Sequence, residues 1–583
     1  MTIFLKSIQI LVGLIASLAS TAAVIPFYHS FEETPGWVTG LIFVLFFLFY
    51  FGVFQAFIHN SSRVGQFLKR PLVWTFTILF VAFLVVSLQG SMEALEENPW
   101  LNLTSVYIVV SITLMIVVLF TLYFLVHHSV ELHWKEVSHW KILLYAIPCI
   151  AVWLLYLAGF YPGNMSPDSL SHWRQIHTHE FSNWHPVIYT WFMMLLTSVW
   201  ESPAVVALAQ IVILAVIFGY GMFSLERSGL PRKWIWLITI LFALSPINGI
   251  YSVILWKDVL FNSFVLLFTV LMYNAVASQG SWLRSNWHMV LLGVTVLGIS
   301  FIRNNGLPIF VVMAVLLFLA YRTYLKKLLI TVGAVAIIYF VVTGPLYNYL
   351  DVTPADPDET LGIPTQQFAR VITEDGQLTS EQENYLNEIM PLKLWKKNYN
   401  PYLTDHIKFA KEYHSQVIFD DFPYYLKTWA AVLKNNPGLY FAAYFDETSI
   451  IWQMNEPEKG YTNIDAKGIH QPNDYHLKAS PLSDSLHEFL LSVNKTTEEH
   501  VRGLMWRPAV YTAIIILAGF AAFLKGGLRV WLIPLPVLLN TMTLLLAIPA
   551  QDFRYQLANS LVFYLMIAVG FLTFKTKRID QYE

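Results

Sequence analysis

The chain has 583 residues, of which 56% are hydrophobic and only 13% are charged, and its net charge at pH 7 is −2. A mean hydropathy of +0.54 excludes a soluble globular protein, whose surface needs more charge. The near-neutral charge balance excludes a basic surface for nucleic acid, and a single cysteine, Cys149, excludes an internal disulfide and a cysteine-based metal site.

Apolar runs follow one another along most of the chain. A helix needs about 20 apolar residues to cross a bilayer, so these runs predict about 13 to 14 transmembrane helices. Short polar loops and one long polar segment separate them. The predicted runs cover residues 5–27, 37–58, 71–90, 104–126, 140–160, 203–224, 234–249, 255–277, 287–302, 305–323, 327–348, 509–524, 529–548 and 555–574.

Lysine and arginine residues in short loops predict the side of each loop, because they favour the cytoplasm. Val187–Trp200 has only about 14 residues, which is short for a span, so we expect it to lie flat at the outer interface. If the N-terminus is cytoplasmic, all basic loops then lie on the cytoplasmic side. The loop with Asp168 is then extracytoplasmic. The basic residues are Arg63, Lys69, Arg70, Arg227, Arg232, Lys233, Arg322, Lys326, Lys327, Lys525, Arg529, Lys575, Lys577 and Arg578; the opposite loops hold Glu32, Glu33, Glu93, Glu96 and Glu97.

The long polar segment, of about 155 residues, is large enough for a small core of its own. Within it Asp405–Ser415 and Pro423–Lys434 are expected to be amphipathic helices, and Pro437–Ile451 an apolar one. The predicted fold is an α-helical polytopic membrane protein with an extracytoplasmic α or α+β domain inserted before the last three spans. The predicted parts are a four-helix extension at 1–126, a transmembrane core at 140–348 with an outer loop at 161–186, the extracytoplasmic domain at 349–508, C-terminal helices at 509–574 and a cytoplasmic tail at 575–583.

The outer loop concentrates ionisable side chains at the predicted membrane edge, where they are costly unless paired or hydrated. Ser166-Pro167-Asp168 predicts a helix that Ser166 caps, with Asp168 and His172 one turn apart on a shared face. Asp168 could instead only help to cap that helix. A divalent metal, Mg²⁺ or Mn²⁺, held by Asp168 and His172 is a further alternative, although the histidines do not have the spacing of a known zinc motif. They are His172, His177, His179 and His185.

Three more places at predicted outer helix ends carry charged groups. A planar guanidinium beside amide groups suits a phosphate. For Lys257 and Asp258 the alternative is a local ion pair at the interface. For Arg303 and Asn304 it is an ordinary tight hairpin, and for Arg554 and Tyr555 it is an isolated outer arginine. The residues are Lys257 and Asp258 at the start of 255–277, Arg303 and Asn304 in the break before Gly306, and Arg554 and Tyr555 before the last run.

Together these residues form a set that could move a group off an anionic lipid carrier. A carboxylate such as Asp168 can accept the proton of an attacking hydroxyl group. Lys257, Arg303 and Arg554 can stabilise the charge that develops on a phosphate leaving group. Because a phosphate leaves as an anion, no second carboxylic acid is required.

The order of these features resembles the GT-C superfamily of membrane glycosyltransferases, which includes protein mannosyltransferases and the lipid A aminoarabinose transferase. The similarity covers about 140–574. The chain departs from it in having a single aspartate in the outer loop, where several relatives have an acidic pair, and Arg303 where some have lysine. The matching features are Asp168, His185-Pro186 opening a short interfacial helix with Tyr189 and Trp191, the basic loop from Glu226, Asp258, Arg303 near Gly306, and Arg554-Tyr555.

The resemblance implies an inverting glycosyltransferase that moves a sugar from a polyprenyl-phosphate donor to a cell-envelope polymer, lipid or protein. It assigns Asp168 as the base or as a group that positions the acceptor. The leading hypothesis takes Asp168 as the general base, with His185 and Asp258 orienting the donor or acceptor. The expected location is the plasma membrane, with many spans, an extracytoplasmic active site and a cytoplasmic C-terminus. The alternative is a transporter or flippase of lipid-linked sugars, for which charged groups on both sides and symmetric interrupted helices are expected.

Overall fold

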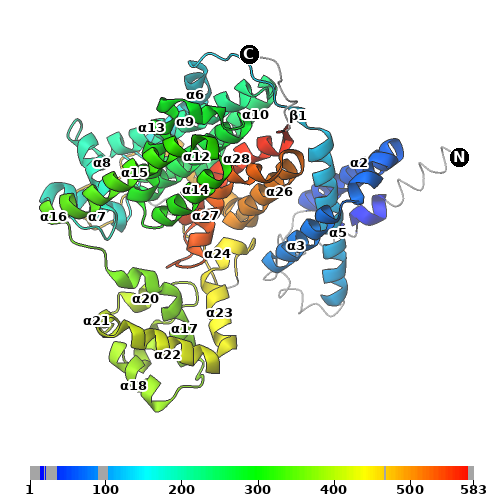
Figure 1. The fold of residues 1–583 in the computed structure, drawn as a ribbon. Coiled ribbons are helices and arrows are strands. Elements are labelled where there is room, and N and C mark those ends of the chain that lie inside the picture. The colour runs from blue at the N-terminus through cyan, green and yellow to red at the C-terminus, as the bar shows by residue number, and fades with distance from the viewer. Residues whose placement is uncertain are drawn as a thin grey trace.

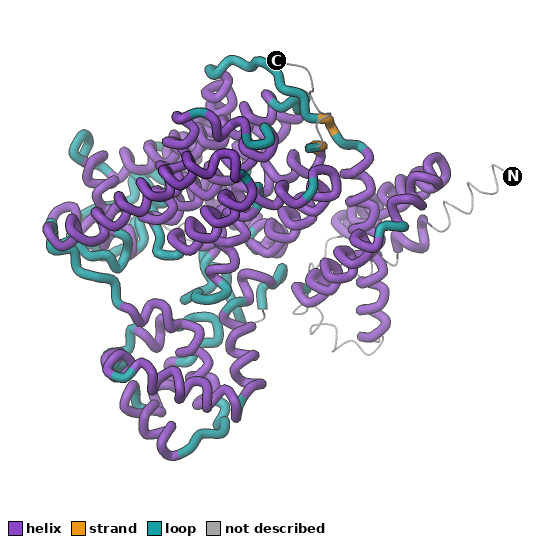
Figure 2. Tube along the Cα trace, in the orientation of Figure 1, coloured by secondary structure: helices purple, strands orange, loops and turns teal. Residues whose placement is uncertain are grey.

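The computed structural model describes residues 13–18, 20–21, 36–88, 103–457, 459–464 and 468–574. These residues are mostly helical (Figures 1 and 2). Two short strands, β1 (Val130–Glu131) and β2 (Leu572–Thr573), pair in parallel, with Val130 opposite Leu572. Most of the predicted first run, the acidic loop residues Glu32, Glu33, Glu93, Glu96 and Glu97, and the tail at 575–583 lie outside the described residues.

Within the described part of the chain, six helical segments are long and apolar enough to cross a bilayer. The chain is therefore a multi-pass integral membrane protein. The helices that carry these segments are α5 (Leu103–His127), α6 (Lys141–Gly159), α9 (Pro203–Arg227), α12 (Lys257–Ala277), α15 (Leu325–Val341) with its short extensions η3 (Arg322–Tyr324), η4 (Val342–Leu346) and α16 (Tyr347–Tyr349), and α26 (Pro508–Gly526).

Two bent pairs raise the number of candidate spans to eight if each pair counts as one. The first lies within α2 (Gly36–Leu68), whose halves meet at 79°, and the second joins α10 (Arg232–Leu244) to α11 (Pro246–Ser252) at 57°. Other apolar helices are shorter than a full span, so the larger number of about 13 to 14 stays a prediction. These are α3 (Pro71–Ser87), α8 (Val187–Thr197), α13 (Asn286–Ile302), α14 (Gly306–Ala320), α27 (Leu535–Leu544) and α28 (Leu557–Phe571).

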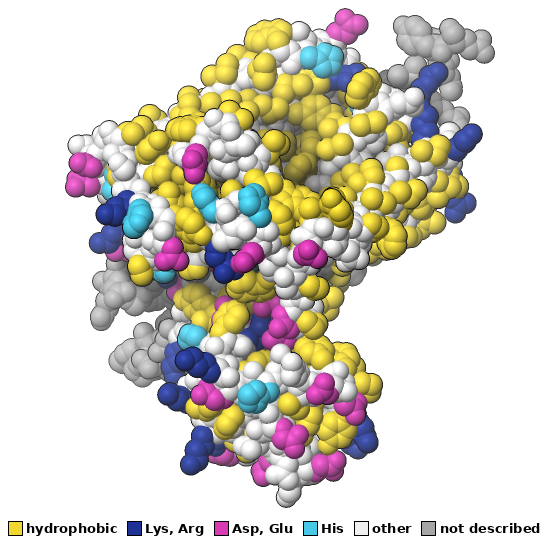
Figure 3. Space-filling model, turned by 90° about the vertical axis from the view of Figure 1, so that its left-hand side faces the viewer, with side chains coloured by type: hydrophobic (Ala, Val, Ile, Leu, Met, Phe, Trp, Pro, Cys, Tyr) yellow, Lys and Arg dark blue, Asp and Glu magenta, His cyan; other side chains and the backbone are white. Residues whose placement is uncertain are grey.

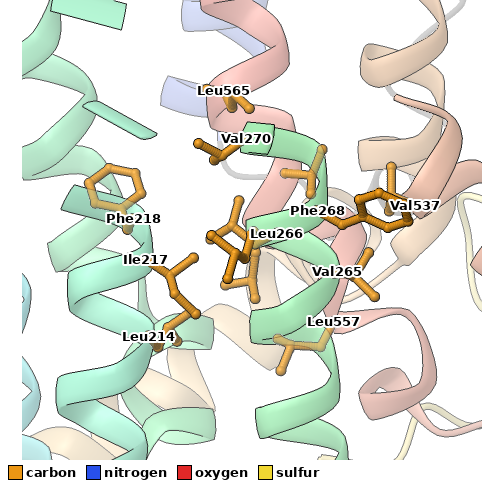
Figure 4. Packing of buried hydrophobic residues seen from close by; sticks show 14 of the residues in the cluster. Leu214, Ile217, Phe218, Val265, Leu266, Phe268, Val270, Val537, Leu557 and Leu565 are labelled. Carbon is orange, nitrogen blue, oxygen red and sulfur yellow. The ribbon is translucent and has the colours of Figure 1, made fainter. Parts of the chain in front are cut away.

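Helix α12 lies at the centre of the bundle. In the most apolar 18-residue stretch of α12, 94% of the residues are buried. A helix that is hydrophobic on all sides is expected to be buried in this way. Side chains of α9 and α12, among them Ile217 and Leu266, point toward one another in the core (Figure 4). Phe218 and Phe242 stack with their ring centroids 3.7 Å apart and join α9 to α10.

Helices α2, α3 and α5 stand beside the bundle (Figure 1). They contact it mainly through α26, where Phe76 of α3 and Phe520 stack face to face at 3.7 Å. The buried Lys525 of α26 also donates to the carbonyl oxygen of Leu125, near the end of α5. The N-terminal helices are therefore packed on the bundle through an apolar contact with a polar anchor at one end.

A helical lobe projects from one end of the bundle (Figure 1). It has its own hydrophobic cluster, in which Phe368, Trp395 and Tyr440 are buried. Its helices are η5 (Pro357–Leu361), α17 (Gly362–Thr373), α18 (Ser380–Ile389), α19 (Leu392–Asn398), α20 (Asp405–Lys408), α21 (Ser415–Asp420), α22 (Phe422–Asn435) and α23 (Pro437–Glu447).

Two of the three helix predictions in this region are confirmed. The segment Pro423–Lys434 lies within α22, and Pro437–Ile451 forms α23 and α24 (Ser449–Trp452). The prediction of one helix over Asp405–Ser415 is wrong, because α20 ends at Lys408. The buried Lys408 ammonium forms an ion pair with Glu359, and the backbone N–H of His414 donates to the Ile389 carbonyl oxygen, so contacts with the rest of the lobe turn the chain away from a helix.

One further helix lies between the lobe and the last part of the bundle along the chain. Helix α25 (Asp484–Met505) lies against α6, where Leu490 packs close to Gly159. The sequence did not predict α25. The remaining short elements are η2 (Ser281–Arg284), η6 (Leu528–Leu532) and η7 (Phe553–Gln556), and η7 leads into α28.

Candidate functional site

Asp168 lies in the first turn of α7 (Pro167–Thr178), a helix of 12 residues that is too short to span a membrane. Pro167 occupies the first helical position, as predicted. The predicted capping hydrogen bond from Ser166 is absent, because its hydroxyl oxygen accepts a hydrogen bond of 2.6 Å from the indole Nε1–H of Trp256. This hydrogen bond connects the start of α7 to Trp256, the residue just before α12.

The Asp168 carboxylate faces cationic groups from distant parts of the chain. Its Oδ2 accepts a hydrogen bond of 2.6 Å from Nη1 of Arg554, and its Oδ1 lies 3.5 Å from Nε2 of His185. Burial by itself would raise the pKa of Asp168, but Arg554, and then His185 and Lys257, outweigh it and hold the pKa well below its usual range. Asp168 therefore carries a negative charge near neutral pH.

His185 connects Asp168 to Lys257. The Lys257 ammonium donates to Nδ1 of His185 at 2.6 Å, and the opposite edge of the imidazole faces Asp168. Burial, and then the Lys257 charge, lower the pKa of His185, so the ring is neutral at neutral pH. A neutral ring that accepts at Nδ1 carries its proton on Nε2, which points it at the carboxylate.

His172 lies beside this group without joining it through a hydrogen bond. Its ring centroid is 5.5 Å from that of His185, and its Nδ1 is 2.7 Å from the hydroxyl oxygen of Thr190. No group of three or more histidine, cysteine, aspartate or glutamate side chains that could hold a metal occurs among the described residues. Arg554 and Lys257 near Asp168 also repel a divalent cation. Asp168 and His172 therefore do not fit an Mg²⁺ or Mn²⁺ site.

A second ion pair joins the start of α12 to the break between α13 and α14. Nη1 of Arg303 donates to Oδ1 of Asp258 at 2.7 Å, and the side chain of Asp258 is only 2% exposed. The Arg303 guanidinium also lies over the Tyr555 ring, 4.9 Å from its centroid. Asp258, Arg303 and Tyr555, which are far apart in the sequence, thus form one cluster.

Arg554 occupies the centre of the site. Besides Asp168, it pairs with Asp552, whose Oδ2 lies 3.0 Å from Nε of the guanidinium. The guanidinium also lies 4.4 Å from the ring of Trp256. A planar guanidinium has donors enough to satisfy two carboxylates while its face lies against an aromatic ring. Arg554 therefore holds together three segments of the chain.

The structure also brings to the site residues to which the sequence assigned no role. Asp552 accepts a hydrogen bond of 3.0 Å from Nδ2 of Asn463, in the segment that leads back from the lobe. Burial raises its pKa to about 6. The side chain of Asn305 donates hydrogen bonds to Asn540 and Thr543. Asn304, which the sequence analysis placed in the site together with Arg303, is exposed. The position of Asp552 two residues before Arg554 was the one available signal.

The site lies where the bundle meets the lobe. Trp184 stacks on His185 with ring centroids 4.5 Å apart, and its indole Nε1–H donates to Glu359 at 3.1 Å. The backbone N–H of Thr404 donates to the Pro549 carbonyl oxygen, close to Asp552 in sequence. Charged side chains gather at this junction and over the lobe, whereas hydrophobic side chains dominate the bundle surface (Figure 3). A substrate carried by the membrane and one approaching from the lobe could therefore meet here.

All four places that the sequence singled out meet in this region. Asp168 contacts Arg554 and His185, Lys257 contacts His185, and Asp258 contacts Arg303. Three carboxylates, Asp168, Asp258 and Asp552, stand against three cations, Lys257, Arg303 and Arg554. Their formal charges cancel. An anion that binds Arg303 or Arg554 must compete with a carboxylate, whereas Lys257 is bonded to the neutral His185.

Comparisons with known proteins give a family without an assigned activity. No curated protein and no solved structure matches the chain. One family model matches residues 3–582, nearly the whole length. The chain therefore belongs to DUF6020, a family of unknown function.

Proposed function

We propose that this protein is a membrane glycosyltransferase that moves a sugar from a polyprenyl-phosphate carrier to a cell-envelope acceptor. One observation carries the proposal: the ionisable residues of four separate segments meet at one end of the bundle, around Asp168 and Arg554. Charged groups at a membrane edge are costly and are typical of functional sites. The similarity of their order along the chain to that of the GT-C superfamily supports the same reaction class.

The proposed reaction uses Asp168 as the general base. An acceptor hydroxyl group gives its proton to the Asp168 carboxylate while its oxygen attacks the anomeric carbon of the donor sugar. The bond between that carbon and the phosphate oxygen breaks, and the polyprenyl phosphate leaves with the bonding electron pair. Arg554 and Arg303, together with Lys257, stabilise the charge that builds on the leaving phosphate. Attack opposite the leaving group inverts the configuration of the anomeric carbon.

The resting geometry suggests how the donor activates the base. Arg554 binds Asp168 at 2.6 Å, which keeps the carboxylate weakly basic. A donor phosphate that draws the guanidinium toward itself weakens this ion pair, and the pKa of Asp168 then rises toward its ordinary value. Asp552 still holds Nε of Arg554 during the exchange. In this proposal the base becomes effective only when a donor is bound.

The lobe is proposed to be extracytoplasmic and to help bind the acceptor. Its residues Glu359 and Phe409 both contact Trp184, which stacks on His185 next to Asp168. Trp184 and Phe409 are 40% and 58% exposed, so aromatic faces are available to a sugar ring beside the base. The same orientation puts the C-terminus in the cytoplasm and the site on the outer face of the plasma membrane, where a lipid-linked donor is the accessible sugar source.

The Asp168→Asn variant tests the proposal. Asparagine keeps the size of the side chain but cannot accept the proton, so we expect the lipid-linked donor to accumulate and the polymer to remain undecorated. Mass spectrometry of cell-envelope polymers and lipid-linked sugars, in cells with the wild-type or variant protein, measures both. Asp474→Asn, at an exposed loop position, is the matched control. Wild-type levels of decorated polymer from Asp168→Asn would contradict the proposal.

An experiment with vesicles can distinguish a transferase from a flippase of lipid-linked sugars. Vesicles that contain purified protein and labelled donor, but no acceptor, report movement across the bilayer without transfer. Flipping that persists in Asp168→Asn vesicles would favour the transporter. Transfer to an added acceptor that needs Asp168, without flipping, supports the enzyme.

A further inference from the structure

A groove runs along the surface of the bundle between α13 and α15. Its volume is about 500 Å³, within the range of small-molecule sites. Apolar side chains line most of it, including Val290, Val294 and Ile330, which are more than half exposed. Gly293 on α13 lies at the floor, where a Cβ atom would contact only Thr331 and Val335 at 3.5 Å or more. The missing side chain at this glycine therefore leaves room for a ligand.

The length of the groove matches one leaflet of a bilayer. Its lining extends from Asn286 to Leu297 on α13 and from Lys327 to Ile338 on α15. At 1.5 Å of rise per residue, each wall is about 16 Å long, close to half of the hydrocarbon thickness of about 30 Å. A groove of this length that starts at a membrane surface reaches the midplane, as an acyl chain does.

The end of the groove at the membrane surface is cationic. Lys327 donates to Oδ1 of Asn286 at 2.7 Å, and Arg284, Arg322 and Lys326 lie close by in sequence. No carboxylate among the described residues forms an ion pair with any of these four cations. Trp287, which is 80% exposed, marks the interface at the same end. This end therefore has positive charge without an ion-paired carboxylate in the described part of the chain.

The proposed active site is at the other end of α13. Asn286 begins this helix and Arg303 follows its last residue, so the two ends are about 25 Å apart. A donor lipid whose phosphate reaches Arg303 has its head group at the opposite membrane surface from Lys327. The occupant of the groove is consequently a different lipid from the proposed donor.

We propose that the α13–α15 groove binds one anionic phospholipid of the leaflet opposite the Asp168 site, with an acyl chain over Gly293 and its phosphate at Lys327. The acyl chain gains apolar contact along both helices, and the head group supplies the missing counter-ion. The lipid also bridges α13, which ends next to Arg303, to the long span of α15.

Native mass spectrometry of the full-length protein tests this site. Protein extracted from vesicles of phosphatidylglycerol and phosphatidylcholine should retain one phosphatidylglycerol molecule per chain. Gly293→Leu fills the floor of the groove, and we expect it to lose that lipid. Gly333→Leu is the matched control: Gly333 lies on α15, outside the groove lining, its Cβ would contact nothing within 4 Å, and the variant should retain the lipid.

Two further variants keep the test decisive. Ala334→Phe fills the groove from the other wall at an exposed position, so its folding should be undisturbed and the lipid should again be lost. Lys327→Gln should abolish the preference for phosphatidylglycerol over phosphatidylcholine while leaving the groove open. The proposal is overturned if Ala334→Phe retains the lipid, if the wild type shows no anionic preference, if a polyprenyl phosphate displaces the lipid, or if a second copy of the chain proves to cover the groove.

Discussion

Asp552 offers a test of the electrostatics around Arg554 that does not depend on any reaction. Its side chain is 4% exposed, and it is held by Arg554 at 3.0 Å, by Asn463 at 3.0 Å and by the backbone N–H of Arg554 at 3.1 Å. Burial raises its pKa from 3.8 to about 6, with Arg554 opposing the shift. The Asp552→Asn variant keeps the shape of the side chain and removes its titration.

The expected effect follows from proton binding in the two states. Between pH 3.8 and 6 Asp552 is ionised in the unfolded chain but protonated in the folded one, so the unfolded chain binds fewer protons and the wild type loses stability as pH rises. A shift of about two pKa units corresponds to about 3 kcal/mol. Relative to the wild type, Asp552→Asn should therefore gain about 2 kcal/mol from pH 4 to pH 6 and about 0.4 kcal/mol more by pH 7.5, where the folded carboxyl is fully ionised.

The assay is the free energy of unfolding of purified protein, followed by tryptophan fluorescence between pH 4 and pH 7.5. Any effect of the substitution that is constant with pH cancels, because only the change with pH is compared. Asp474→Asn, at an exposed site, should show a flat difference from the wild type. A flat difference for Asp552→Asn, or one that falls with pH, would refute the argument that burial dominates at Asp552.

Two other predictions concern the break between α13 and α14. Arg303→Met leaves the buried Asp258 without its ion pair and should lower the unfolding free energy by about 3–5 kcal/mol, and a second change, Asp258→Asn, should recover much of it. If the double variant is no more stable than Arg303→Met in the same unfolding assay, the ion-pair argument is contradicted. Gly306→Ala places a Cβ 2.1 Å from the Ile299 carbonyl oxygen and should cost about 1–3 kcal/mol, whereas Gly333→Ala, inside α15 with no atom in reach, should gain up to about 1 kcal/mol. Equal stability of the two alanine variants would contradict the packing argument.

Hydropathy predicted most of the bundle helices because an apolar run long enough to cross a bilayer must form a helix there. The runs at 140–160, 203–224 and 255–277 correspond to α6, α9 and α12. The polar region was less predictable. The segment Asp405–Ser415 does not form one helix and α25 was not foreseen, because contacts with other parts of the chain, such as Lys408 with Glu359, decide where such helices begin and end.

The sequence by itself determined that Asp168, Lys257, Arg303 and Arg554 each stand at the end of an apolar run, where a charge is costly unless it has a partner. Only the tertiary structure decided the partners. Asp168 meets Arg554, which is 386 residues away in the chain, and Asp258 meets Arg303, so both arginines are already paired with carboxylates, whereas Lys257 meets His185. The physical reason is that local sequence sets how far a charged group lies from its own helix, whereas the packing of α7, α12, α13 and η7 sets which charges come within hydrogen-bonding distance.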